Sequence, residues 1–420
     1  MSVYRPQPRF RRDGNGARQR VDAVAAVADE PPVPFARTEI TEEARLAVQR
    51  VLASGWVTMG PETELFEQEF AARVRAEHAV AVSSCTAAIE LALRALRLPP
   101  GSEVLVPTLT FCGAAQAIVH AGLQPVLVDV DPDTAMPSPD TVVRAARACE
   151  RPRAMLGLHF AGAPAPLAEL ADAAGLPMAR VVEDAAHAVG TFVDDRPVGA
   201  HSRAACFSFY ATKNLPIGEG GMVTTDDTDI AARVRRARLH GMSADAWRRN
   251  LPGGSWRYTV DDAGLKANMT DVQAAIGRAQ LRHLTDWQHR REAISTWYTA
   301  RLRRVPGLRL PAVPARGRHA WHLYVVRVLE EYGMSRDELI TRLAERGIST
   351  SVHFIPLHRM PYFRRTAVFP PGGMPGADML FGQLLSLPMH PGLTERPVDR
   401  VCTALRELAR HLSPEEVWRS

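Results

Sequence analysis

Residues 78–130 read HAVAVSSCTAAIELALRALRLPPGSEVLVPTLTFCGAAQAIVHAGLQPVLVDV and indicate the fold class. Three short apolar segments in this stretch predict strands: 78–83, 103–107 and 125–130. Two segments with helical spacing lie between them, at 86–96 and 113–121. Strands that are apolar along their whole length and alternate with helices are typical of a mostly parallel sheet covered on both faces.

The alternation extends in both directions from this stretch. On the N-terminal side, Thr41 is expected to cap a helix that runs to residue 53, and a second helix follows at 62–76. Downstream, the same criteria predict helices 141–149 and 166–174 and strands 154–158, 180–183, 204–208 and 222–225. Long amphipathic helices are then expected from residue 270 to residue 302.

A second and smaller α/β region is expected after Pro306-Gly307. Its predicted elements are strands 322–329, 351–354 and 384–388 and helices 335–346 and 398–412. We therefore expect three parts: a mobile Arg-, Ala- and Pro-rich extension over 1–34, a large domain over 35–290 and a small C-terminal domain over 291–420.

The composition favours a soluble globular protein. Its 420 residues are 46% hydrophobic and 23% charged, which excludes a mostly disordered or collagen-like chain. The longest apolar stretches have about ten residues, whereas a membrane-spanning helix needs roughly 20, so we expect no membrane association. The net charge of +5 is small and no basic cluster indicates nucleic-acid binding. The five cysteines form no CxxC pair, so we expect no metal site, no disulfides and a reducing cytoplasmic location.

Lysine is rare in this chain. Of the 51 basic residues only Lys213 and Lys266 are lysines, and the other 49 are arginines. A guanidinium stays protonated, whereas an amine can lose its proton and attack a carbonyl. A chain that uses arginine wherever a positive charge suffices marks both lysines as candidates for amine chemistry, although either could also be a plain surface residue.

Three further patterns surround Lys213. The stretch VEDAAHAVG (182–190) places Asp184 at the end of an apolar strand, where α/β sheets carry ligand-binding residues. Lys213 follows 29 residues later in SFYATKN (208–214), and GEGG (218–221) comes next. Upstream, SSCTAA (83–88) is a small-residue turn that opens a helix and suits a phosphate.

An imine-forming lysine, an acid for a pyridinium nitrogen and a phosphate cradle are what pyridoxal 5'-phosphate (PLP) requires. Each pattern alone has a bland alternative, because a strand-end aspartate is often structural and a small-residue helix start is often only a cap. Their joint occurrence predicts a PLP site.

The chain resembles the DegT-type sugar aminotransferases of PLP fold type I, and most of all the branch that makes UDP-4-amino-4-deoxy-L-arabinose. The resemblance runs from about residue 34 to the C-terminus. It rests on SGWVTMGP (54–61), HFAGAP (159–164), EDAAHAVG (183–190), HAWHL (319–323) and the region from VHF (352–354) to His358. It implies an α/β fold with a large PLP domain and a smaller C-terminal domain.

The resemblance also implies residue roles. Lys213 would form the imine with PLP and then shuttle protons as its freed amine, and Asp184 would hold the pyridine nitrogen protonated. His187 would contact the phenolic oxygen of the cofactor. Phe111 and Ala186 would pack on the two faces of the cofactor ring. Cys85, Thr86 and Ser208 would hold the phosphate. The alternatives are that Phe111 is a core residue, that His187 is structural and that the Cys85 thiol has no role.

Lys266 is where this chain departs from its relatives. Many relatives have Asn-x-Arg here, and the asparagine reaches across the dimer interface to the partner's cofactor phosphate, whereas this chain has Lys266-Ala267-Asn268. We expect Lys266 to take the crossing role, with Asn268 in the same cofactor site or close to the substrate. The enzyme would then be a homodimer with shared active sites.

The resemblance implies small-molecule substrates: an amino-acid donor, usually L-glutamate, and a keto-sugar nucleotide with the keto group at C4. PMP would be the intermediate form of the cofactor. We expect His159, Trp321, His353 and His358, with loops 241–256 and 353–363, to line the sugar pocket. Relatives that aminate 3-keto sugars or keto-cyclitols in natural-product biosynthesis share these motifs. A PLP- or PMP-dependent dehydratase would have histidine at 213, and a non-catalytic regulator would be expected to lose Lys213 or Asp184.

Overall fold

The computed structural model describes residues 31–199, 201–243, 256–314 and 316–410. The chain forms two compact units, of which one ends at Pro32 and the other begins at Val33. We describe the second unit, because the first lies almost entirely outside the described residues. Val33 is buried, donates its backbone N–H to Gly347 O at 2.8 Å and pairs with Ile348. The folded unit therefore includes Val33 and Pro34, whereas the sequence predicts that the extension reaches residue 34.

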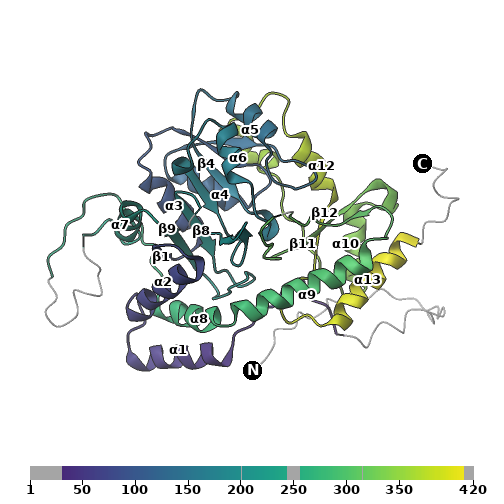
Figure 1. Ribbon diagram of the computed structural model, residues 1–420, viewed down its shortest axis with the longest axis horizontal. Coiled ribbons are helices and arrows are strands. Elements are labelled where there is room, and N and C mark those ends of the chain that lie inside the picture. The colour runs from purple at the N-terminus through teal and green to yellow at the C-terminus, as the bar shows by residue number, and fades with distance from the viewer. Residues whose placement is uncertain (1–30, 200, 244–255, 315, 411–420) are drawn as a thin grey trace, which may run out of the picture. The chain divides into compact units, whose positions relative to one another are not determined.

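The core of this unit is a seven-stranded sheet (Figure 1). Its strands, in spatial order, are β1 (His78–Val82), β9 (Gly221–Thr225), β8 (Ala204–Ser208), β5 (Val181–Asp184), β4 (Pro152–Leu158), β2 (Glu103–Pro107) and β3 (Gln124–Val128). The pairs among β8, β5, β4, β2 and β3 are parallel, and β9 runs antiparallel to both β1 and β8. The predicted mostly parallel α/β sheet is confirmed.

Both faces of the sheet are covered, as the apolar strands predict. In β1, Val80 and Val82 pack on one face with α3 (Cys85–Ala95) and α7 (Thr228–Ala237). Ala79 and Ala81 pack on the other face with α2 (Pro61–Val74) and α8 (Asp271–Leu281). Alternate residues of a strand point to opposite faces, so an all-apolar strand needs cover on both. The other helices of this region are α1 (Glu42–Ser54), α4 (Cys112–His120), α5 (Pro139–Ala146) and α6 (Leu167–Ala173).

The C-terminal region has its own sheet and core. The antiparallel strands β10 (Leu308–Arg309), β11 (Tyr324–Val328) and β12 (Leu384–Leu387) pack with the long helix α9 (Leu284–Leu302) in a separate apolar cluster. Four further helices belong to this region: α10 (Arg336–Glu345), α11 (Pro361–Thr366), α12 (Pro375–Gln383) and α13 (Glu395–Arg410). The predicted strand at 351–354 is wrong, because only Ser351 pairs, in an isolated bridge with Ser386. The domain boundary at residue 290 falls inside α9 and stays a prediction.

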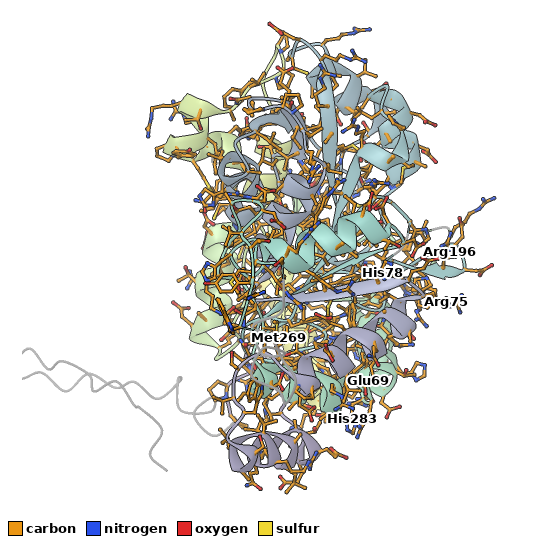
Figure 2. The ribbon with its side chains drawn as sticks, turned by 90° about the vertical axis from the view of Figure 1, so that its left-hand side faces the viewer. Glu69, Arg75, His78, Arg196, Met269 and His283 are labelled. Atoms are coloured by element: carbon orange, nitrogen blue, oxygen red, sulfur yellow. The ribbon has the colours of Figure 1, made fainter. Side chains whose placement is uncertain are left out.

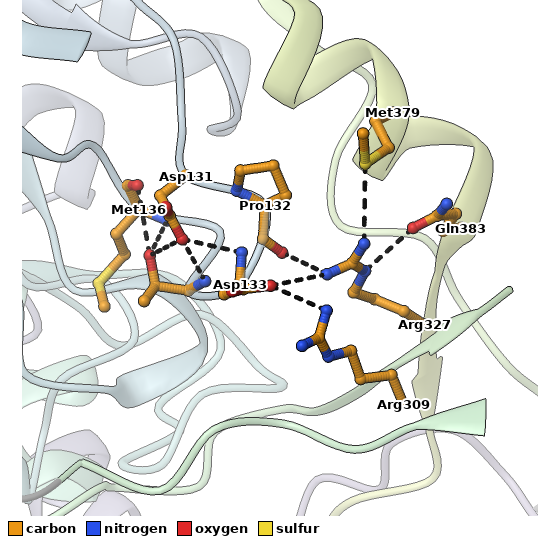
Figure 3. Close-up of polar contacts among 9 residues, drawn as sticks. Asp131, Pro132, Asp133, Met136, Arg309, Arg327, Met379 and Gln383 are labelled. Atoms are coloured by element: carbon orange, nitrogen blue, oxygen red, sulfur yellow. Dashed lines mark hydrogen bonds and ion pairs between the residues drawn. The ribbon is translucent and has the colours of Figure 1, made fainter. Parts of the chain in front are cut away.

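A polar clamp joins the two sheets (Figure 3). Arg327 on β11 donates to Pro132 O at 2.7 Å and to Asp133 Oδ1 at 3.4 Å, in the loop that follows β3. Arg309 pairs with the same Asp133 carboxylate at 2.9 Å. The position of the C-terminal sheet is thus tied to the loop beyond the edge strand β3.

A separate two-stranded hairpin consists of β6 (Phe192–Val193) and β7 (Arg196–Pro197). Arg75, just after α2, donates to Asp195 O in the hairpin turn at 3.3 Å, and Figure 2 shows Arg75 and Arg196 close together. Within the described residues, no helix combines the length and apolarity that crossing a membrane needs.

Candidate active site

A cavity of about 520 Å³ opens at the carboxyl edge of the central sheet. Its walls come from the ends of β4, β5 and β8, the start of α3 and the turn after β8. Ligands of open α/β sheets bind at this edge. Nine of the residues predicted for the site line this cavity: Cys85, Thr86, Phe111, Asp184, Ala186, His187, Ser208, Lys213 and His353.

Lys213 lies in the turn between β8 and β9. Its backbone N–H donates to Tyr210 O at 2.9 Å, and Ile217 N–H closes the turn onto Phe209 O at 2.9 Å. Burial lowers the pKa of the Lys213 side chain from 10.5 to about 8, and the nearby Cys85 and Asp184 only partly offset this effect. At pH 7 roughly a tenth of such side chains carry a free amine, which is the form that attacks carbonyls.

Asp184 is the last residue of β5 and lines the same cavity. Its Oδ1 accepts a hydrogen bond from Ala186 N–H at 3.1 Å, and Cys85 Sγ lies 4.0 Å from the same oxygen. Burial raises the pKa of Asp184, while the Ala186 N–H and the Lys213 charge act in the opposite direction. A buried carboxylate with so little compensation would be stabilised by a cationic N–H partner.

The start of α3 faces the cavity through Ser84, Cys85 and Thr86. The Ser84 hydroxyl caps the helix by accepting from Ala87 N–H at 3.1 Å. The first N–H groups of a helix lack intrahelical partners and, with the helix dipole, they suit an anion such as phosphate. Gly221 of β9 packs against this turn so tightly that an added Cβ would lie 2.5 Å from Ser84 O. The sheet therefore holds the turn in a fixed place.

Phe111 is 61% exposed and lines the cavity. The backbone of Gly113 makes room for it, because an added Cβ would lie 2.6 Å from Thr86 Oγ1 and 3.2 Å from the Phe111 ring. An exposed aromatic ring on a cavity wall is suited to stacking on a planar ligand. Its exposure argues against the alternative that Phe111 is a core residue.

His187 lies deeper in the cavity wall. Its Nδ1 accepts a hydrogen bond from Ala161 N–H at 3.2 Å, so the neutral ring carries its proton on Nε2. Its ring stacks on Phe354 with centroids 5.8 Å apart. Burial, with the nearby Lys213 charge, lowers the pKa of His187 well below its ordinary value, so the ring is neutral near pH 7.

His322 is a cavity residue that the sequence interpretation did not select. It lies in the quoted HAWHL stretch, and its Nε2 is 3.4 Å from Lys213 Nζ. The sequence instead predicts Trp321 for the substrate pocket, but the Trp321 ring stacks on His319 with centroids 4.0 Å apart and does not line the cavity. A motif of three aromatic side chains does not by itself say which of them faces a ligand.

Two other predicted substrate residues also lie outside the cavity wall. His159 is fully buried and its Nε2 lies 2.9 Å from Glu183 Oε2. His358 lies between Thr108 Oγ1 at 2.9 Å and Asp378 Oδ1 at 3.0 Å. In this conformation neither ring lines the cavity, and their roles in substrate binding stay predictions. Of the predicted loops, residues 244–255 lie outside the described residues.

Lys266 and Asn268 are likewise not part of this cavity wall. Lys266 is exposed and its ammonium donates to Asn268 Oδ1. The segment runs beside the end of β1, where Ser83 N–H donates to Ala267 O at 2.8 Å and Val82 pairs with Asn268. The backbone at Ala267 and Asn268 therefore lies close to the start of α3, and the side chains of Lys266 and Asn268 do not line the cavity of their own chain.

Several lining residues were not singled out from the sequence. Among them are Phe35, Tyr210, Thr212, Glu219 and His322, whereas Phe354 belongs to the predicted loop 353–363. Tyr210, Thr212 and Glu219 are close in sequence to Lys213, and this proximity was the available signal. Phe35 lies at the start of the folded unit, where nothing in the sequence points to a site.

The described residues fit PLP. Lys213 supplies a partly unprotonated amine for an aldehyde, Asp184 an under-compensated carboxylate for a pyridinium N–H, and α3 a row of N–H groups for a phosphate. Ser208 and Thr86 line the same cavity and add hydroxyl groups.

Known proteins with this pattern are found by sequence and by structure. The model of the DegT/DnrJ/EryC1/StrS aminotransferase family matches residues 38–406. The spore coat polysaccharide biosynthesis protein SpsC of Bacillus subtilis (strain 168) is 44% identical over 380 residues, which cover 90% of this chain and 97% of SpsC.

Solved structures show the same likeness. DesV of S. venezuelae is 38% identical, with a TM-score of 0.81 over 91% of this chain and 100% of DesV. Spr1654 of Streptococcus pneumoniae, solved in a PMP form, is 29% identical, with a TM-score of 0.81 over 90% of this chain and 99% of its own. A PLP form of Spr1654 has also been solved.

Proposed function

Because the chain belongs to the DegT/DnrJ/EryC1/StrS aminotransferase family and is a PLP-dependent sugar aminotransferase of fold type I, we propose a specific reaction for it. The enzyme moves the amino group of L-glutamate onto the C4 keto group of a nucleotide-linked sugar. The observation that carries the proposal is the single cavity in which Lys213, Asp184 and the start of α3 meet.

Bound PLP supplies an aldehyde that exchanges amino groups and a ring that accepts electrons. Lys213 would hold the cofactor through its aldehyde and, as a free amine, would accept and return a proton at Nζ. Asp184 would hold the proton on the ring nitrogen through a charge-assisted hydrogen bond. His187 would donate its Nε2–H to a cofactor oxygen, and Phe111 would stack on the ring.

The substrate assignment is tested with the amino-loaded enzyme. Purified protein is converted to the PMP form with L-glutamate and offered UDP-linked sugars with a keto group at C4 or at C3, and a keto-cyclitol. Mass spectrometry should detect the amine from the 4-keto sugar. Exclusive amination of the 3-keto sugar or the cyclitol would contradict the C4 assignment and support a role in natural-product biosynthesis.

We also propose that the enzyme is a homodimer in which Lys266 reaches the partner's cofactor phosphate. Support comes from the exposure of Lys266, its position beside the end of β1 and its absence from the cavity of its own chain. An ammonium at this place would give a charged contact to the phosphate. Asn268, which accepts from Lys266, would orient it.

Mixed dimers test this sharing. One chain carries Lys213→Ala and the other carries Lys266→Ala, with different tags for purification. The hybrid should contain one complete site, with Lys213 from one chain and Lys266 from the other, and should retain PLP at that site as tightly as wild type. PLP retention no better than that of the Lys266→Ala homodimer would contradict the crossing contact.

A cytoplasmic location is the remaining part of the proposal. All five cysteines are free thiols, which agrees with a reducing compartment. Fractionation of cells that express the tagged protein would test it.

A further inference from the structure

We infer that His322 is a positioning residue for Lys213, with Asn214 holding its imidazole in the tautomer that leaves Nε2 free to accept from the lysine amine. The inference rests on the proposed function, in which the Lys213 amine is the reacting group. It assigns a role to a residue that lines the cavity but has no place in the steps described above.

The first step is the contact itself. Lys213 Nζ and His322 Nε2 are 3.4 Å apart, and His322 is 5% exposed. An amine or an ammonium group can always donate an N–H. The lysine therefore donates to His322 if Nε2 is unprotonated.

The Asn214 side chain settles that question. Its amide nitrogen donates to Val189 O at 3.3 Å and to Ala320 O at 2.9 Å, which fixes which end of the amide is nitrogen. The amide oxygen therefore faces His322 Nδ1, at 3.1 Å. An oxygen can only accept, so Nδ1 carries the proton of the neutral ring and Nε2 is bare.

The backbone around His322 is also held firmly. Arg291 is 2% exposed and donates to Trp321 O at 3.1 Å and to His322 O at 3.4 Å. Ala320 N–H donates to Gly162 O at 2.9 Å. The backbone that carries the imidazole is therefore fixed, and the bond from Nδ1 to Asn214 holds the ring itself.

The charged and titratable groups around His322 keep it neutral. Burial and the nearby Lys213, His187, Arg291 and His353 all lower its pKa well below the ordinary value. Nε2 therefore remains an acceptor at neutral pH. When one N–H of the neutral Lys213 amine is directed to His322, the lone pair and the other N–H occupy the two positions around Nζ that point away from His322.

The chain offers a direct test, because it contains only two lysines. In a Lys266→Arg background, lysine labelled with ¹³C at Cε gives one side-chain NMR signal, which belongs to Lys213. Its pH titration in the full-length protein without cofactor reports the Lys213 pKa. The same titration is repeated with His322→Leu, His322→Gln and His353→Leu.

In His322→Leu the lysine ammonium loses its hydrogen-bond acceptor, so the Lys213 pKa should fall by about one unit. A hydrogen bond to a charged group stabilises the charged form by roughly the free energy that one pKa unit represents. His322→Gln, which keeps an acceptor, should restore at least half of the difference. His353→Leu is the matched control, since His353 is a neighbouring imidazole that bonds to Ser386 Oγ at 2.8 Å rather than to the lysine. An unchanged pKa in His322→Leu, or an equal fall in His353→Leu, would overturn the inference.

A measurement on the unaltered protein guards against variants that fail to fold. The ¹⁵N shifts of the His322 ring should report a proton on Nδ1, and a proton on Nε2 would overturn the inference. Neither measurement needs cofactor turnover. Failure of the proposed function would appear instead as a lack of transamination in protein whose Lys213 titration is as expected.

Discussion

His187 and His322 lie with ring centroids 4.5 Å apart, and their hydrogen bonds assign them opposite tautomers. Ala161 N–H occupies Nδ1 of His187, whereas Asn214 Oδ1 accepts from Nδ1 of His322. One neutral ring is thus left with a donor and its neighbour with an acceptor. The donor suits a cofactor oxygen, and the acceptor faces the Lys213 amine.

The lowered pKa of Lys213 predicts a pH-dependent cost to stability in the cofactor-free protein. The pKa is about 8 when folded and 10.5 for an ordinary lysine, so burial of the charge destabilises the fold fully below pH 8. Lys213→Met should therefore be inactive yet more stable, by up to about 3 kcal/mol below pH 8. The gain should shrink as pH rises from 8 toward 10.5.

Urea unfolding of the cofactor-free proteins across this pH range would measure the effect. Lys266→Met is the control, because Lys266 is exposed and should show no such pH-dependent gap. A Lys213→Met gain that is constant with pH, or a variant that keeps full turnover, would contradict the assignment of Lys213.

Asp184→Asn should weaken the enzyme without unfolding it. The amide keeps the shape of the side chain but loses the charge that would hold a proton on the cofactor ring. We expect the rate constant of the half-reaction with L-glutamate to fall about a hundredfold, since a hydrogen bond to a charged group is worth about 1.5–3 kcal/mol and about 2.7 kcal/mol corresponds to that factor. Single-turnover kinetics with L-glutamate would measure this, and a rate within twofold of wild type would rule out the assigned role.

Gly162 lies between the backbones of His187 and His322, where a side chain would not fit. It has φ of +96°, and an added Cβ would lie 2.9 Å from His187 O and 3.3 Å from His322 N. Gly162→Ala should lower the free energy of unfolding by about 2–4 kcal/mol, from backbone strain and overpacking together.

Gly175→Ala is the matched control for Gly162→Ala. Gly175 also has a positive φ, of +66°, but an added Cβ would meet nothing within 4 Å. It should lose only about 1 kcal/mol, from strain alone. Thermal unfolding would compare the stability of both variants. Equal losses of unfolding free energy would show that the space beside Gly162 can accommodate a Cβ.

The clamp at Asp133 predicts unequal roles for two arginines. Arg327 is 9% exposed and also donates to Gln383 Oε1 at 3.0 Å, whereas the side chain of Arg309 is 53% exposed. Arg327→Ala should cost about 1–2 kcal/mol because it removes hydrogen bonds to the partly buried Pro132 O and Gln383 Oε1, and Arg309→Ala under about 1 kcal/mol. Denaturant unfolding would compare them, and equal losses would contradict this account of the clamp.

Much of the central fold could be predicted because its signals are local. The strands 103–107 and 204–208 match β2 and β8 as found, since apolar runs between turns need no tertiary information. The antiparallel direction of β9 could not be predicted, because an apolar strand does not record its neighbour's direction. The strand expected at 351–354 is not formed, since Ser351 is the one residue of this segment whose backbone pairs with β12.

In the candidate site, too, some residues could be predicted from local sequence and others depend on distant contacts. Lys213 and Asp184 could be predicted from chemistry and position, because few residue types can do their tasks. His322 could not, since its role depends on the Asn214 amide, which lies 108 residues away. His159 was placed in the substrate pocket, but its ring lies against Glu183 in the buried ends of β4 and β5, and side-chain direction of this kind is set by packing.

The absorbance spectrum of the purified protein with PLP, before and after addition of L-glutamate, tests the central claim most directly. The account predicts a visible band from lysine-bound PLP, which falls on addition of glutamate while a near-ultraviolet band of PMP rises. The Lys213→Met variant should show no such visible band. A visible band that ignores L-glutamate would contradict the proposed donor, and wild-type protein that never forms the band would contradict the site itself.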